Sequence, residues 1–107
     1  LAPLLLAGVL AATPLLRRTL HPGVVGWSEV EAYIARERPQ RVLAIGVGYD
    51  ESHLMHVRLG LFPEPAQPPL PPGVPVIVDT KYGTAPEDAE VLFETGRFVV
   101  VRTRAGD

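Results

Sequence analysis

The sequence predicts an α+β fold, in which a small antiparallel or mixed sheet of about four strands carries helices packed on one face. Two observations lead to this prediction. The chain has 107 residues, of which 47% are hydrophobic and 21% charged, and this suits a single globular domain over residues 1–107. The expected elements run as helices, strand, strand, long connector, strand, helix and strand, and adjacent strands without a helix between them favour antiparallel or mixed pairing.

The N-terminal run of 16 residues carries no charge and is rich in leucine. Pro3 suits the first turn of one helix, and Thr13 with Pro14 starts a second, short one. The run is shorter than the roughly 20 apolar residues of a membrane span. Arg17 and Arg18 follow it, whereas a signal peptide has its basic residues first. We expect a packed core or interface helix here; a targeting remnant and a membrane-associated segment are the alternatives.

Two elements precede the ambiguous part of the chain. Ser28 and Glu31 have the spacing of a capping box, which predicts a helix over residues 29–38 that Pro39 ends. Residues 41–48 are apolar and rich in β-branched side chains. We therefore expect a strand there that is buried on both faces.

Residues 52–62 fit two secondary structures. Over ten residues the side chains can be divided into two alternating sets, one for each face of a strand. This two-residue period favours a strand that turns back from Asp50 and Glu51 as a hairpin. The alternative is a helix over residues 51–59, in which one stripe would carry Leu54, Val57 and Leu61. The choice decides the fold class, because the helix would give a doubly wound, three-layer α/β fold.

The C-terminal half begins with a connector. Seven prolines in residues 63–75 exclude a regular element and predict an extended path. A short strand is expected over residues 76–80. A second capping box, Thr84-x-x-Glu87, predicts a helix through Thr95, and a final strand follows it.

Composition excludes several kinds of chemistry. Without cysteine there is no disulfide, thiolate metal site or cysteine nucleophile. Nine arginines against one lysine, no asparagine and 12 prolines are typical of a heat-adapted organism, although a GC-rich genome favours the same residues. We expect a cytoplasmic protein.

The net charge of −2 does not attract polyanions to the protein as a whole, so we expect neither nucleic-acid nor membrane binding. A nucleic-acid surface would need one continuous basic patch made of Arg17, Arg18, Arg36, Arg38 and Arg41.

The turn between the strand at residues 76–80 and the expected helix is the strongest candidate for a ligand site. It carries Asp79, Lys81, Tyr82 and Thr84, and Lys81 is the only lysine of the chain. Open sheets bind ligands at such strand ends, where amide hydrogens can hold an anion. The alternative is that these residues serve only the turn and the helix cap.

His53 and His56, with Asp50 and Glu51, are the densest group of potential metal ligands. On a helix the two histidines would share a face, as metal-binding pairs do, whereas on the favoured strand they point to opposite faces. We therefore expect no metal and no cofactor. The histidines remain candidates for lining the same cleft as the turn.

Gly46-x-Gly48 ends a predicted strand, as phosphate-binding turns do. The third glycine of that motif is replaced by Glu51, and a carboxylate would repel a pyrophosphate. The pattern therefore favours a bulge or close backbone packing over nucleotide binding.

Two hypotheses about function follow. The first is a non-enzymatic association module, forming a homodimer, because the uncharged N-terminal run and an exposed sheet edge would both need covering. The alternative is a small-molecule-binding protein or minor enzyme that uses the turn at residues 79–84, with His53 or His56 in the same cleft. No set of catalytic residues can be named from the sequence.

Overall fold

The computed structural model describes residues 25–104. The elements are α2 (Trp27–Glu37), β1 (Leu43–Ile45), α3 (Tyr49–Leu59), β2 (Glu64–Pro65), β3 (Val76–Asp79), β4 (Glu90–Thr95) and β5 (Phe98–Arg102). The strands form one mixed sheet in the order β2-β1-β3-β5-β4. β1 is parallel to β2 and β3, whereas β5 is antiparallel to β3 and β4. The predicted α+β class with a mixed sheet is confirmed, with five strands in place of about four.

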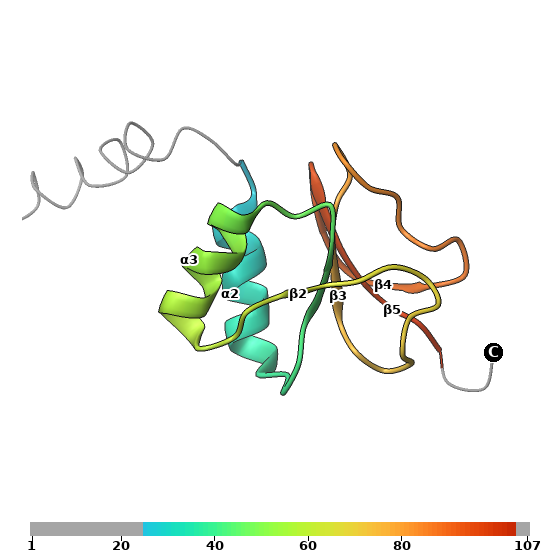
Figure 1. Cartoon of the computed structure of the whole chain (residues 1–107), viewed down its shortest axis with the longest axis horizontal. Coiled ribbons are helices and arrows are strands. Elements are labelled where there is room, and N and C mark those ends of the chain that lie inside the picture. The colour runs from blue at the N-terminus through green and yellow to red at the C-terminus, as the bar shows by residue number, and fades with distance from the viewer. Residues whose placement is uncertain (1–24, 105–107) are drawn as a thin grey trace, which may run out of the picture.

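Both helices cover one face of the sheet, and loops cover the other (Figure 1). The core on the helix side joins Val30, Ile34 and Met55 to Ile77, Phe98 and Val100 of the strands. On the opposite face, valines of β3 and β5 pack under Leu70 and Val74 of the proline-rich connector and under Ala85 and Ala89. Within residues 25–104, the central strands are therefore buried on both sides, by helices on one face and by loops on the other.

The direction of the chain explains why connector and helix lie on opposite faces. From β1 the chain passes through α3 to the edge strand β2, and the connector then returns beneath the sheet to β3 on the other side of β1. Parallel connections keep a right-handed sense. Two connections that run in opposite directions along a sheet must therefore cover opposite faces.

Helix α2 confirms the predicted helix but not its cap. It begins at Trp27 after Gly26, whose φ is 99°, so Ser28 lies inside the helix instead of capping it. Trp27 is buried and packs on Phe98, with ring centroids 5.3 Å apart. Glu31 is buried too, and its carboxylate accepts hydrogen bonds from Trp27 Nε1 at 3.0 Å and from Arg58 Nη1 at 2.6 Å. Gly26 therefore takes the N-cap position, Ser28 is exposed in the first turn, and the Glu31 carboxylate binds Trp27 and Arg58 instead of an amide at the helix start.

The hairpin predicted over residues 52–62 is wrong, because Tyr49–Leu59 forms helix α3. Met55 is fully buried and Leu59 packs against the same core, and these residues lie four positions apart on one helical face. Val57, which a strand would bury beside them, is 68% exposed. The three-layer alternative had the helix right, but the second face of the sheet carries loops.

The helix predicted to start at Thr84 is also wrong. Residues 80–89 form a loop, and β4 follows as the first arm of a hairpin with β5. Phe93 of β4 stacks on Tyr33 of α2, with centroids 4.9 Å apart, so the core selects the extended conformation. Gly96, with φ of 47°, provides the hairpin turn that the sequence had suggested as a helix end.

The remaining predictions hold with shorter bounds. The strand expected at residues 41–48 covers only Leu43–Ile45, and those expected at 76–80 and near the C-terminus are β3 and β5. The connector is irregular apart from the two residues of β2. The helices expected near Pro3 and Thr13 lie outside the described residues. Among residues 25–104, neither helix is long and apolar enough to cross a membrane.

Glu31 joins α2 to α3, so replacing it with alanine is expected to lower the free energy of unfolding by about 2 kcal/mol. The substitution leaves the buried Trp27 Nε1 without its acceptor and Arg58 without its counter-ion. Urea unfolding measures the loss. Glu29→Ala on the exposed side of the same helix is the control and should change stability by less than about 0.5 kcal/mol. Equal effects of the two substitutions would contradict the role of Glu31.

Candidate functional site

The carboxyl ends of β1 and β3 meet at one edge of the sheet, where two turns pack backbone to backbone. Gly46 has a φ of 74°, and a β-carbon there would lie 3.1 Å from Gly83 N and 3.2 Å from the Asp79 carbonyl. Only glycine allows this approach. The close packing expected of the Gly46-x-Gly48 pattern is therefore confirmed. The Glu51 carboxylate folds back over Gly48 at the start of α3, in the place where a phosphate would bind.

Asp79 lies at the end of β3 and is only 2% exposed. Its carboxylate accepts hydrogen bonds at 2.7 Å from both Nε and Nη2 of Arg97, in the turn between β4 and β5, and at 3.0 Å from the Lys81 amide. The hydrogen bonds to Asp79 raise the pKa of Arg97, so the guanidinium stays charged. Next to the pair, the carbonyl of Arg97 accepts hydrogen bonds from the amide and the hydroxyl of Thr80. Asp79 therefore joins the two halves of the sheet.

Lys81 and Tyr82 lie exposed above this ion pair. The Tyr82 ring is 66% exposed, with Lys81 Nζ 5.4 Å and Arg97 Cζ 5.5 Å from its centroid. The structure thus brings three of the four turn candidates together and adds Arg97, which the sequence analysis missed because the segment of β4 was predicted as a helix and the β4–β5 hairpin was not foreseen. Thr84 is exposed in the following loop.

The two candidate histidines lie elsewhere. His53 stacks on Tyr49 with centroids 5.8 Å apart, and His56 meets the edge of Phe62 at 6.0 Å. The rings beside the histidines are those of Tyr49 and Phe62, whereas Lys81 and Tyr82 lie beside Arg97 of the β4–β5 turn. The two sets of candidates therefore have different neighbours, and neither groove described below contains any of them.

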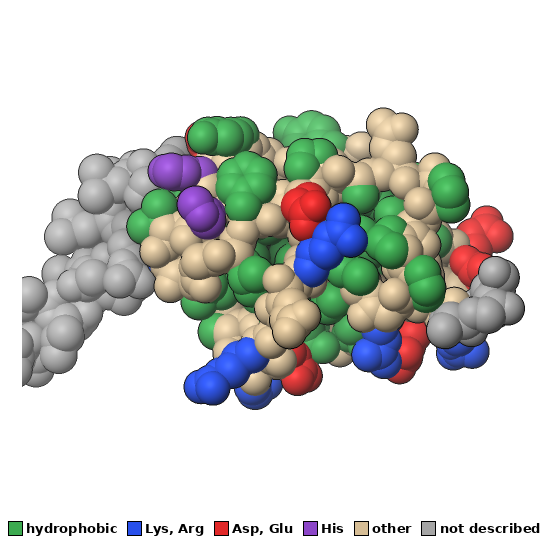
Figure 2. All heavy atoms as spheres, turned by 60° about the horizontal axis from the view of Figure 1, so that its bottom comes forward, with side chains coloured by type: hydrophobic (Ala, Val, Ile, Leu, Met, Phe, Trp, Pro, Cys, Tyr) green, Lys and Arg blue, Asp and Glu red, His purple; other side chains and the backbone are tan. Residues whose placement is uncertain are grey.

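We define the outer face of α3 as Tyr49, His53, His56 and Val57 together with the adjoining Phe62. Tyr49 is 70% exposed and Val57 68% exposed, and the two described histidines lie among hydrophobic side chains (Figure 2). Asp50 flanks this face, whereas the helical periodicity places Glu51 and Arg58 on the opposite side, where Arg58 binds Glu31. The middle of the face carries no charged side chain.

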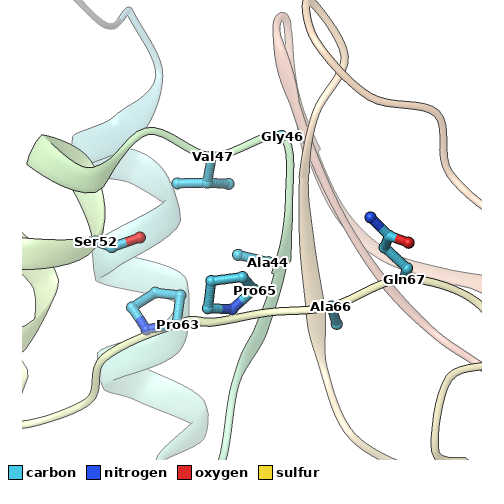
Figure 3. A pocket seen from close by; sticks show the side chains of 8 residues that line it. All are labelled: Ala44, Gly46, Val47, Ser52, Pro63, Pro65, Ala66 and Gln67. Carbon is cyan, nitrogen blue, oxygen red and sulfur yellow. The ribbon is translucent and has the colours of Figure 1, made fainter.

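A groove of about 400 Å³ opens between α3 and the strands β1 and β2 (Figure 3). Its only polar side chains are Ser52 and Gln67, and neither titrates in the ordinary pH range. It is lined by Ala44, Gly46, Val47, Ser52, Pro63, Pro65, Ala66 and Gln67. None of the six candidate site residues lines it, so it offers a small neutral space without an acid or base.

A second groove of about 650 Å³ lies at the opposite end of the sheet, below Tyr33. Burial, followed by the nearby Glu37 carboxylate, raises the pKa of the Tyr33 hydroxyl, which stays protonated at neutral pH. The two arginines of this groove are bound elsewhere: Arg41 pairs with Glu64 and Arg102 with Glu90. The groove therefore holds no unneutralised basic cluster.

In the part of the chain that the structure describes, no three His, Asp or Glu side chains lie close enough to hold a metal ion. No protein-family model matches the chain, and no curated protein or solved structure is significantly similar to it.

Asp79→Ala is expected to lower the free energy of unfolding by about 3 kcal/mol, because it leaves the guanidinium of Arg97 without its counter-ion beside the core. Thermal or urea unfolding gives the value. Asp88→Ala, in the exposed part of the same loop, serves as the control and should be near neutral. If the Asp79 variant kept wild-type stability, the ion pair would not hold the sheet together.

Proposed function

We propose that this chain is a non-enzymatic association module that forms a homodimer through the outer face of α3. The supporting observation is the pair of large exposed side chains, Tyr49 and Val57, beside three further aromatic rings on one side of a helix. Aromatic residues without intervening charge are enriched in the buried centres of protein interfaces. A second copy supplies the same face, as a twofold interface requires.

The sheet edges are less suited to association than the sequence suggested. β2 has only two residues, one of them Pro65, and its Glu64 is paired with Arg41. β4 is longer but carries a register shift at Leu92, with Glu90 and Glu94 on either side. Proline, bulges and charges are the means by which natural sheets prevent edge pairing. These edges favour a contact through the helix.

The buried acids of the described residues support a role without catalysis. Glu31 and Asp79 are the two buried carboxylates, and each binds an arginine and a further N–H donor. A general acid or base needs access to a substrate proton. Both groups instead stabilise the fold.

A specific observation favours a second candidate function, the binding of a small anion at Lys81, Tyr82 and Arg97. Two cations lie within 5.5 Å of the exposed Tyr82 ring, and Asp79 fixes one of them. Preorganised cations beside an aromatic surface suit a flat carboxylate such as benzoate.

If benzoate binds there, Lys81→Ala should raise its dissociation constant about two- to five-fold, the range for losing one exposed charge contact. Amide chemical shifts during a benzoate titration report the affinity. Arg104→Ala removes another exposed cation and should leave the affinity unchanged. Equal affinities for the Lys81 variant and the wild type would exclude this site.

The dimer is tested by sedimentation over a range of protein concentrations. Val57→Glu should raise the dimer dissociation constant at least about tenfold, because a twofold contact loses the valine and gains a desolvated carboxylate on both copies. Val91→Glu is the matched control, since Val91 is 56% exposed on the edge strand β4. A strict monomer at the highest concentration, or a larger effect at Val91, would contradict the proposal.

A further inference from the structure

The helical conformation of residues 49–59 restores a pairing that a strand would have prevented. His53 and His56 are three positions apart on α3, so their β-carbons lie about 5–6 Å apart on one face. Both side chains are exposed. Two imidazoles at this spacing can bind one metal ion through a nitrogen each, at about 2.0–2.1 Å for zinc.

Aromatic neighbours restrict both imidazoles. The His53 ring stacks on Tyr49 with an angle of 8° between the planes, and the His56 ring meets Phe62 at 79°. Tyr49 and Phe62 also contact each other, with centroids 6.0 Å apart, so the four rings form one packed group. Side chains that are held in place before binding lose less conformational entropy when they bind.

The electrostatic surroundings admit a cation. Arg58, the arginine of α3, binds Glu31 at 2.6 Å and lies about 160° around the helix from His56, toward α2. Asp50 lies at the edge of the outer face and adds negative charge nearby. A dication would therefore meet no positive side chain of α3.

One copy of the chain supplies only half of a metal site. Structural zinc takes four ligands in a tetrahedron, and no third metal-binding side chain joins this pair among residues 25–104. The pair lies at the middle of α3, which runs from residue 49 to residue 59. A twofold axis that passes between two α3 helices, beside the midpoint of each, would thus bring four imidazoles together.

The outer face of α3 is too small to hold a stable dimer by itself, so a bound metal ion would strengthen the contact. A helix of 11 residues is about 16 Å long and 10 Å wide, so its footprint is on the order of 160 Å². A stable interface buries roughly 800 Å² per partner. Contact between two α3 faces alone would be weak, and a shared metal ion would supply the missing attraction.

We infer that His53 and His56 of two copies bind one divalent zinc-like ion across a twofold contact between their α3 helices, an inference that rests on the proposed homodimer. The ion is held by four imidazole nitrogens, with no change of oxidation state. Zinc accepts this ligand set without a geometric penalty, because its filled d shell imposes no preferred arrangement. Metal binding thereby controls the assembly state.

The test is a titration of the metal-free full chain with zinc chloride, followed by isothermal calorimetry and sedimentation. The expected result is one Zn²⁺ per two chains and a dimer dissociation constant at least about tenfold lower with the metal, reversed by a chelator. Cobalt(II), used as a spectroscopic probe, should show the intense visible bands of tetrahedral coordination. One ion per chain without dimerisation, or no binding, would overturn the inference.

Variants separate this inference from the proposed homodimer. His53→Ala and His56→Ala should each show the same dimer dissociation constant with and without zinc, because each variant is compared with its own metal-free form, and His21→Ala, at the third histidine, should retain the full zinc effect. Zinc-dependent dimers that survive in both histidine variants would also overturn it. If the metal-free chain associates through the outer face of α3 but zinc does not change the association, only the metal site is wrong. If the metal-free chain never associates, the proposed homodimer is wrong.

Discussion

The ion pair between Asp79 and Arg97 is the contact on which the arrangement of this domain depends. It joins the end of the central strand β3 to the turn between β4 and β5, where the Thr80 hydrogen bonds to the Arg97 carbonyl reinforce it. The turn that follows Asp79 supports Gly46, after which α3 begins. One buried carboxylate therefore links the end of β3 to the β4–β5 turn and, through the Lys81 amide, to the turn that packs against Gly46.

The same arrangement separates the residues that hold the fold together from those that are exposed to a partner. Asp79 and Glu31 are buried, and the carboxylate of each binds an arginine. These two acids therefore stabilise the fold. The exposed outer face of α3 makes no such contribution to the core, since Met55 and Leu59 anchor the helix from its other side. Tyr49 and Val57 of this face are exposed and so remain accessible to a partner.

The elements that could be predicted from the sequence are those whose conformation is determined by neighbouring residues. Helix α2 and the strands β3 and β5 follow from patterns of apolar residues with clear ends. The α+β class was predicted from adjacent strands over residues 41–62, whereas the adjacent strands of the structure are β4 and β5. Segments with two acceptable patterns were decided by distant contacts. Met55 selects the helix at α3 by entering the core, and Phe93 selects the strand at β4 by stacking on Tyr33. Neither contact can be seen in a local window of sequence.

The candidate site was predicted in part for the same reason. Asp79, Lys81 and Tyr82 are adjacent in sequence and remain together, but their partner Arg97 is 18 residues beyond Asp79 and follows a segment that was predicted as a helix and is the strand β4. The histidines could not be placed until the conformation of α3 was known. Only the helical conformation places the two histidines on one face, with the exposed Tyr49 and Val57 beside them.

The central claim is that copies of this chain meet at the outer face of α3, and the most direct measurement is a dilution series followed by amide ¹H–¹⁵N spectra of the metal-free protein. The account expects concentration-dependent shifts confined to residues 49–57 and the neighbouring Phe62, with β4 unchanged. Shifts along Glu90–Thr95, or around Lys81 and Tyr82 in place of α3, would contradict it.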